Sequence, residues 1–114
     1  MKKLLLFVAL SATAIGVQAK QPVDNLGAQA ISAADFSTAE TRLTAQLRRE
    51  PGLPEALLNL AYVYRATGRG SEARELYERV LARPNLELEG GAKPAWSHDI
   101  ARLGLARMQR FASR

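Results

Sequence analysis

The segment from Pro54 to Pro84 places the strongest constraint on the fold of this chain. It contains two apolar stripes with helical spacing, separated by Gly68. The stripes are Leu57, Leu60, Ala61 and Tyr64, followed by Ala73, Leu76, Tyr77, Val80 and Leu81. Glycine ends a helix readily, because without a Cβ it adopts the left-handed conformation. The segment therefore predicts two helices packed as a hairpin, with Ser71 as the N-cap of the second helix.

A weaker copy of this pattern lies 34 residues earlier in the chain. Shifted by that period, Val23, Leu26, Gly27, Ala39, Leu43 and Leu47 fall on Leu57, Leu60, Ala61, Ala73, Tyr77 and Leu81. Residues 20–53 are therefore expected to form a degenerate first repeat, and residues 54–85 a regular second one. Within the first repeat, a helix is expected over 23–33, with Gly27 inside it. Its partner helix is expected to begin at a Ser-Thr-Ala-Glu capping box, residues 37–40.

The spaced residues resemble the tetratricopeptide repeat (TPR), whose pattern is W-x₂-L-G-x₂-Y…A-x₃-F…P. Here the pattern reads Leu57-x₂-Leu60-Ala61-x₂-Tyr64…Ala73-x₃-Tyr77…Pro84. Leucine replaces the tryptophan, and alanine replaces the glycine by another small residue. The resemblance covers residues 20–85 and implies an all-α fold, a short TPR-like solenoid of antiparallel helix hairpins. Ala34 stands in the first repeat where the family usually has glycine.

The pattern breaks after Pro84, where residues 86–94 contain Gly90-Gly91 and show no helical period. We expect this loop to lay Leu86 and Leu88 on the helices. Residues 95–114 are expected to form a C-terminal capping helix and a basic tail, because terminal units of repeat proteins are atypical. The buried stripe of this helix is predicted to consist of Trp96, Ile100 and Leu103, extended by Met108 and Phe111.

Residues 1–19 have the parts of a secretory signal peptide. Two lysines precede an apolar run from Leu4 to Val17, and small residues stand before the expected cut between Ala19 and Lys20. The expected location is periplasmic or secreted, without stable membrane insertion after cleavage. The alternative is that the segment is kept as an N-terminal anchor. Removing Lys2 and Lys3 lowers the net charge from +5 to +3.

Composition gives little support for catalysis. The chain has no cysteine and a single histidine, His98, which stands beside Asp99. A metal site needs at least three converging protein ligands, and a catalytic triad needs a nucleophile and a base close in space. Neither pattern surrounds His98, so we expect no enzyme activity, no cofactor and no metal. The arginines near the C-terminus are interpreted as a solvated face, and nucleic acid is disfavoured as a partner by the export signal.

The TPR resemblance implies a concave face, lined by the first helix of each hairpin, that binds a peptide or a segment of a partner. Counting from the buried stripe, the candidate binding residues are Asn59, Tyr62, Arg65, Glu55 and Leu58, with Asn25 as the counterpart of Asn59. The function implied is a non-catalytic, exported protein–protein interaction module. The alternative is a structural protein of the cell envelope that dimerises through the open edge of its short array.

Overall fold

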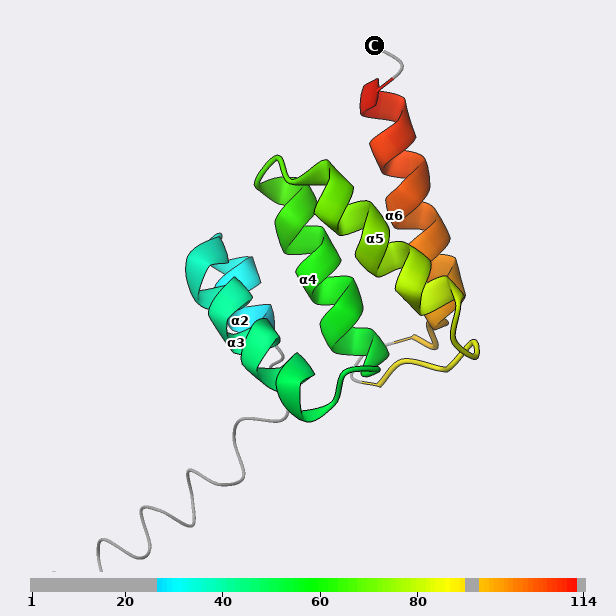
Figure 1. Ribbon diagram of the computed structural model, residues 1–114, viewed down its shortest axis with the longest axis horizontal. Coiled ribbons are helices and arrows are strands. Elements are labelled where there is room, and N and C mark those ends of the chain that lie inside the picture. The colour runs from blue at the N-terminus through cyan, green and yellow to red at the C-terminus, as the bar shows by residue number, and fades with distance from the viewer. Residues whose placement is uncertain (1–26, 90–92, 113–114) are drawn as a thin grey trace, which may run out of the picture.

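The computed structural model describes residues 27–89 and 93–112, and this part of the chain is all-helical. Its helices are α2 (Ala28–Ser32), α3 (Phe36–Arg49), α4 (Pro54–Ala66), α5 (Gly70–Leu81) and α6 (Ser97–Ala112). Successive long helices run antiparallel, so that α4 and α6 point the same way on either side of α5 (Figure 1). Helix α4 packs against α3, α5 and α6. The predicted all-α, TPR-like arrangement of hairpins is confirmed.

The hairpin of α4 and α5 forms the centre of the core. Its buried side chains include Leu57, Leu60, Ala61, Val63, Ala73, Leu76, Tyr77 and Val80. The two predicted small residues, Ala61 and Ala73, are fully buried. Between the helices, Gly68 has a φ of 79°, as its position at the end of α4 predicts. The backbone N–H of Arg69 donates to the carbonyl oxygen of Tyr64 at 2.7 Å and closes the turn.

Two predicted helix caps are wrong. Helix α5 begins at Gly70 and takes Arg69 as its N-cap, because the turn closes there, so Ser71 lies inside the first turn. Helix α3 begins at Phe36, and its N-cap is Asp35, whose Oδ1 accepts a hydrogen bond from the Thr38 N–H at 3.3 Å. The capping box expected at residues 37–40 therefore lies within the helix rather than before it.

The first helix of the first repeat is shorter than predicted. Gly27 precedes α2 with a φ of 78°, a left-handed conformation that no residue within an α-helix adopts. Placing Gly27 inside the helix was therefore wrong. The equivalence with Ala61 predicted a small residue correctly, since a Cβ on Gly27 would lie 3.1 Å from Leu43 Cγ. The rest of the predicted helix, residues 23–26, and the proposed signal segment lie outside the described residues.

Ala34 follows α2 with a φ of 58°, whereas Gly68 occupies the equivalent position after α4 with a φ of 79°. A non-glycine residue in the left-handed region costs about 1–2 kcal/mol, and replacing it by glycine removes this strain. Glycine also makes the unfolded chain more flexible, which offsets about 0.5–1 kcal/mol of the stabilisation. We therefore expect Ala34→Gly to raise the free energy of unfolding by about 0.5–1 kcal/mol, measured by urea denaturation.

Gly68→Ala is the matched control for Ala34→Gly. No atom lies within 4 Å of a Cβ built on Gly68, so the substitution introduces backbone strain without a steric overlap. It should lower the free energy of unfolding by about 1 kcal/mol. If both variants shift stability in the same direction, the strain assigned to Ala34 is refuted.

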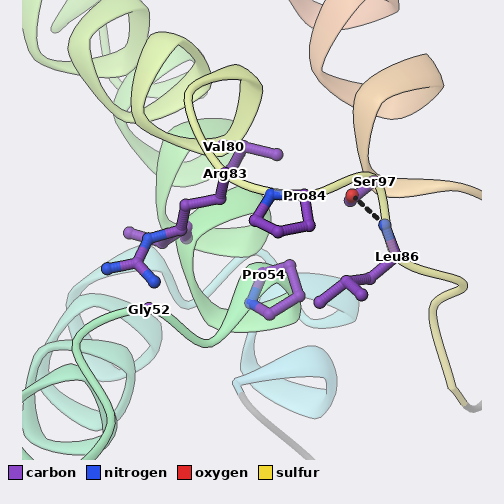
Figure 2. A pocket seen from close by; sticks show the side chains of 8 residues that line it. Gly52, Pro54, Val80, Arg83, Pro84, Leu86 and Ser97 are labelled. Carbon is purple, nitrogen blue, oxygen red and sulfur yellow. Dashed lines mark hydrogen bonds between the residues drawn. The ribbon is translucent and has the colours of Figure 1, made fainter.

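The loop after α5 is held at both of its ends. Leu88 N–H donates to the Ala95 carbonyl at 2.7 Å, and Ser97 N–H donates to the Leu86 carbonyl at 2.8 Å, as part of a β-bridge between Glu87 and Trp96. Leu88 packs against the core as expected. Leu86 is 48% exposed and is therefore only partly covered. Figure 2 shows Leu86 beside Pro54 and Pro84, at a small hollow of about 50 Å³.

Helix α6 is rotated relative to the prediction. Trp96, Ile100 and Leu103 were expected to be buried but are 43%, 37% and 46% exposed. Its buried positions are instead the small residues Ser97, Ala101 and Gly104. A methyl group on Gly104 would overlap the ring of Tyr77 on α5. The close approach of α5 and α6 thus needs small residues at the contact and turns Ile100 and Leu103 away from it. Met108, as predicted, packs against the core.

Candidate functional site

An open hollow of about 350 Å³ lies between α2, α4 and α6, above the side chain of Tyr77 from α5. We call it the concave groove. Its lining residues are Ile31, Leu58, Asn59, Tyr62, Arg65, Tyr77, Ile100, Leu103, Gly104 and Arg107. The lining is mostly apolar with a few polar groups, the usual composition of a binding site in this size range. Its walls come from the first helix of each hairpin and from α6, the next helix in the series (Figure 1).

Four of the candidate residues identified from the sequence line this groove together: Leu58, Asn59, Tyr62 and Arg65. Glu55 is placed elsewhere, in the first turn of α4, where its Oε2 accepts a hydrogen bond from the Glu89 N–H at 3.2 Å. It therefore anchors the loop before α6 rather than lining the groove. Asn25 lies outside the described residues.

Sequence reasoning missed the second wall of the groove. Ile100, Leu103 and Arg107 line it from α6, and Ile31 and Tyr77 complete it. The prediction assigned the apolar residues of α6 to the core because large apolar side chains usually mark the buried face of a helix. The signal that could have corrected it is the run of small residues at positions 97, 101 and 104, a seam for close helix packing.

Polar side chains gather at one end of the concave groove. The guanidinium of Arg65 lies 5.4 Å from the ring centroid of Tyr62, within the range of a cation–π contact. Tyr62 in turn meets Phe36 edge to face, with 6.4 Å between ring centroids. Burial raises the pKa of Tyr77, while Arg65 and Arg107 act in the opposite direction. Both guanidiniums therefore act electrostatically on the buried phenol at the floor of the groove.

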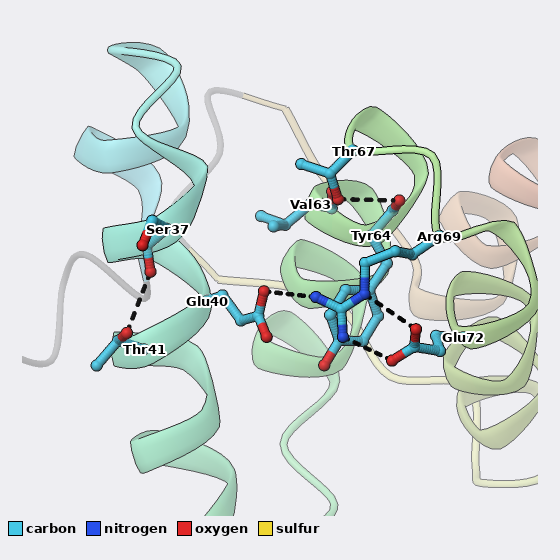
Figure 3. Close-up of polar contacts among 8 residues, drawn as sticks. All are labelled: Ser37, Glu40, Thr41, Val63, Tyr64, Thr67, Arg69 and Glu72. Atoms are coloured by element: carbon cyan, nitrogen blue, oxygen red, sulfur yellow. Dashed lines mark hydrogen bonds and ion pairs between the residues drawn. The ribbon is translucent and has the colours of Figure 1, made fainter.

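A second polar cluster joins the hairpins away from the groove (Figure 3). Arg69 binds Glu40 of α3 at 2.7 Å and Glu72 of α5 at 2.6 Å. Its guanidinium also lies 4.0 Å from the ring centroid of Tyr64. The hydrogen bond to Glu72 is the main reason that the pKa of Arg69 is raised, and the same bond lowers the pKa of Glu72. One side chain thus contacts residues of three helices.

This cluster predicts a loss of stability in acid. The pKa of Glu72 is lowered from 4.5 by its bond to Arg69, so in that range the unfolded chain binds more protons than the folded one. The stabilisation is complete above pH 4.5 and is lost as pH falls through the lowered pKa. Urea denaturation from pH 7 to pH 3 should show a decline that is shallower in Arg69→Gln. An equal decline in both proteins would contradict the assignment.

His98 takes part in the loop contacts that begin α6. Its Nε2 lies 2.7 Å from the Arg83 carbonyl oxygen, and its backbone N–H donates to Asn85 Oδ1 at 3.0 Å. Asp99 lies 3.8 Å from Arg102. Among the described residues, no group of three or more His, Cys, Asp or Glu side chains could hold a metal ion. No helix in the described part of the chain is long and apolar enough to cross a membrane.

Comparison with known protein families identifies the fold. A family model described as tetratricopeptide repeat matches residues 30–87, which run from the middle of α2 to the loop after α5. The chain therefore belongs to the tetratricopeptide repeat family, whose members generally mediate protein–protein interactions. Neither the curated proteins nor the solved structures contain a match to the chain.

Proposed function

We propose that the chain is a non-catalytic interaction module that binds a peptide or a segment of a partner protein in the concave groove. The observation that supports this best is the apolar lining left exposed there. Tyr62 is 39% exposed, and Ile100 and Leu103 face the same hollow from α6. Exposed apolar side chains gathered in a hollow on a folded domain usually mark a surface that another molecule covers.

The two sides of the groove offer complementary contacts. Ile100 and Leu103 provide exposed apolar surface, and the ring of Tyr62 provides a flat anchor that loses little entropy when it is covered. Arg65 can bind a carboxylate with paired hydrogen bonds. Asn59 supplies an amide that both donates and accepts, which suits the backbone of a bound segment.

Affinity capture with matched variants tests the proposal. The full-length sequence is expressed, and the purified product is used to capture proteins from an extract of its own cell envelope. We expect Leu103→Ser, and Tyr62→Ala combined with Asn59→Ala, to abolish capture of the partner while helicity measured by circular dichroism is kept. Leu86→Ser is the control, because Leu86 is 48% exposed, close to the 46% of Leu103, but lies outside the groove. Unchanged capture by the groove variants would refute the proposal.

Self-assembly through the open edge of the array stays a prediction. Outside the groove, the exposed positions of α6 include the polar residues Asp99, Arg102, Gln109 and Arg110, which do not form an apolar edge for a second copy. Sedimentation at micromolar concentration tests this alternative. A dimer that survives Leu103→Ser would favour self-assembly over binding in the groove.

We propose further that the module works after export. The support is the charged, apolar and small-residue pattern of residues 1–19. N-terminal sequencing of the protein recovered from the periplasm or the medium should begin at Lys20. Recovery of the intact chain in the membrane fraction would instead support a retained anchor.

A further inference from the structure

The two walls of the concave groove carry the same order of side chains. On α4, Leu58 is followed seven residues later by Arg65, and on α6, Ile100 is followed seven residues later by Arg107. The two helices run in the same direction (Figure 1). Seven residues of helix rise about 10 Å. Each wall therefore begins with an aliphatic side chain and ends, about two turns farther along, with a guanidinium.

The positive charges of Arg65 and Arg107 are not neutralised by acidic residues of the groove lining. Among residues 27–89 and 93–112, the ion pairs involve neither Arg65 nor Arg107. None of the described residues that line the groove is acidic. Both arginines line the same hollow as Tyr77, Arg65 from α4 and Arg107 from α6. The basic end therefore favours a negatively charged group on whatever occupies the groove.

From this arrangement we propose that the groove binds a protein segment with aliphatic side chains at one end and side-chain carboxylates at the other. The aliphatic side chains lie against Ile100, which is 37% exposed, and against the small accessible part of Leu58, which is 5% exposed. The carboxylates, about 10 Å farther along the segment, bind Arg65 and Arg107. This inference rests on the proposed function, and it adds the chemistry and the spacing of the segment that is recognised.

The spacing defines what the segment looks like in sequence. On a helix, the aliphatic and acidic residues stand seven positions apart, because seven residues rise about 10 Å. In an extended segment, they stand about three positions apart, because each residue advances about 3.3 Å. An acidic residue placed at the aliphatic end would lie against apolar surface without a cation, which costs binding free energy.

Selection from peptide libraries tests this inference. The full-length sequence is expressed, and the purified product selects random peptides of about 12 residues, long enough for three helical turns. One library is displayed with both peptide ends fused, so that no terminal carboxylate is free, and a second has free C-termini. We expect the fused library to yield binders with leucine or isoleucine at one end and aspartate or glutamate at one of the two expected spacings.

Charge variants then assign the carboxylate contact. For a selected peptide, Arg65→Gln and Arg107→Gln should each weaken binding about tenfold, the typical loss for one charge-assisted pair. Raising the salt concentration should weaken binding to the unmodified protein more than binding to these variants. Arg74→Gln removes the same charge from an exposed position of α5 outside the groove and should leave binding unchanged.

The outcomes distinguish a failure of the proposed function, binding in the groove, from a failure of this inference, recognition of side-chain carboxylates. If no peptide is selected whose binding depends on Leu103, both the proposed function and this inference fail. If peptides bind in the groove but lack acidic residues, or bind Arg65→Gln and Arg107→Gln unchanged, only the inference fails. Binders found solely in the library with free C-termini would assign the arginines to a terminal carboxylate and would also overturn it.

Discussion

Leu57→Ala should lower the free energy of unfolding by about 2–5 kcal/mol, the range for removing a fully buried leucine side chain. Leu57 has no exposed surface, and it lies on α4, the helix that packs against α3, α5 and α6. Small domains have total stabilities of about 0.05–0.15 kcal/mol per residue. The substitution should therefore remove a large part of the stability of this chain, measured by urea denaturation followed by circular dichroism.

Leu86→Ala is the control for this prediction. It removes the same atoms from a leucine that is 48% exposed in the loop before α6. We expect a loss of about 1 kcal/mol or less, because substitutions at exposed positions seldom cost more. Similar losses for the two variants would mean that Leu57 is not at the centre of the core.

The hairpin of α4 and α5 could be predicted closely because its sequence signals agree with one another. The apolar period, the small residues at 61 and 73 and the glycine at 68 all specify the same two helices and the same turn. The predicted caps of α3 and α5 were each wrong by two residues. Before α3, Asp35 and Ser37 can both act as caps, and Asp35 does so. Before α5, the cap position falls on Arg69, where the turn closes, although its side chain makes no capping hydrogen bond.

Half of the groove could be predicted and half could not. The wall formed by α4 followed from counting away from its buried stripe, and Leu58, Asn59, Tyr62 and Arg65 do line the hollow. The wall formed by α6 did not follow, because hydrophobicity alone assigned Ile100 and Leu103 to the core. The rotation of α6 is determined by how closely it approaches α5, and that distance depends on the shape of side chains at one contact rather than on an apolar period.

That contact gives the second large effect: Gly104→Ala should destabilise the protein by up to about 2 kcal/mol. Alanine favours a helix over glycine by about 1 kcal/mol. A Cβ on residue 104 would overlap the ring of Tyr77, which is 3% exposed and closely packed, and extra atoms in a packed core cost about 1–3 kcal/mol. The steric cost should exceed the gain in helix propensity, as measured by urea denaturation.

Two further variants separate the gain in helix propensity from the steric cost at residue 104. Ala106→Gly, at an exposed position of α6, reports helix propensity without a packing change and should cost about 1 kcal/mol. In a Tyr77→Leu background the ring is gone, so Gly104→Ala should become neutral or stabilising, and the double-mutant cycle should give a coupling of about 1–3 kcal/mol. If Gly104→Ala instead stabilises the protein with Tyr77 in place, then α6 does not approach α5 at Gly104. In that case Ile100 and Leu103 would be free to turn into the core, and the wall that they form in the concave groove would be lost.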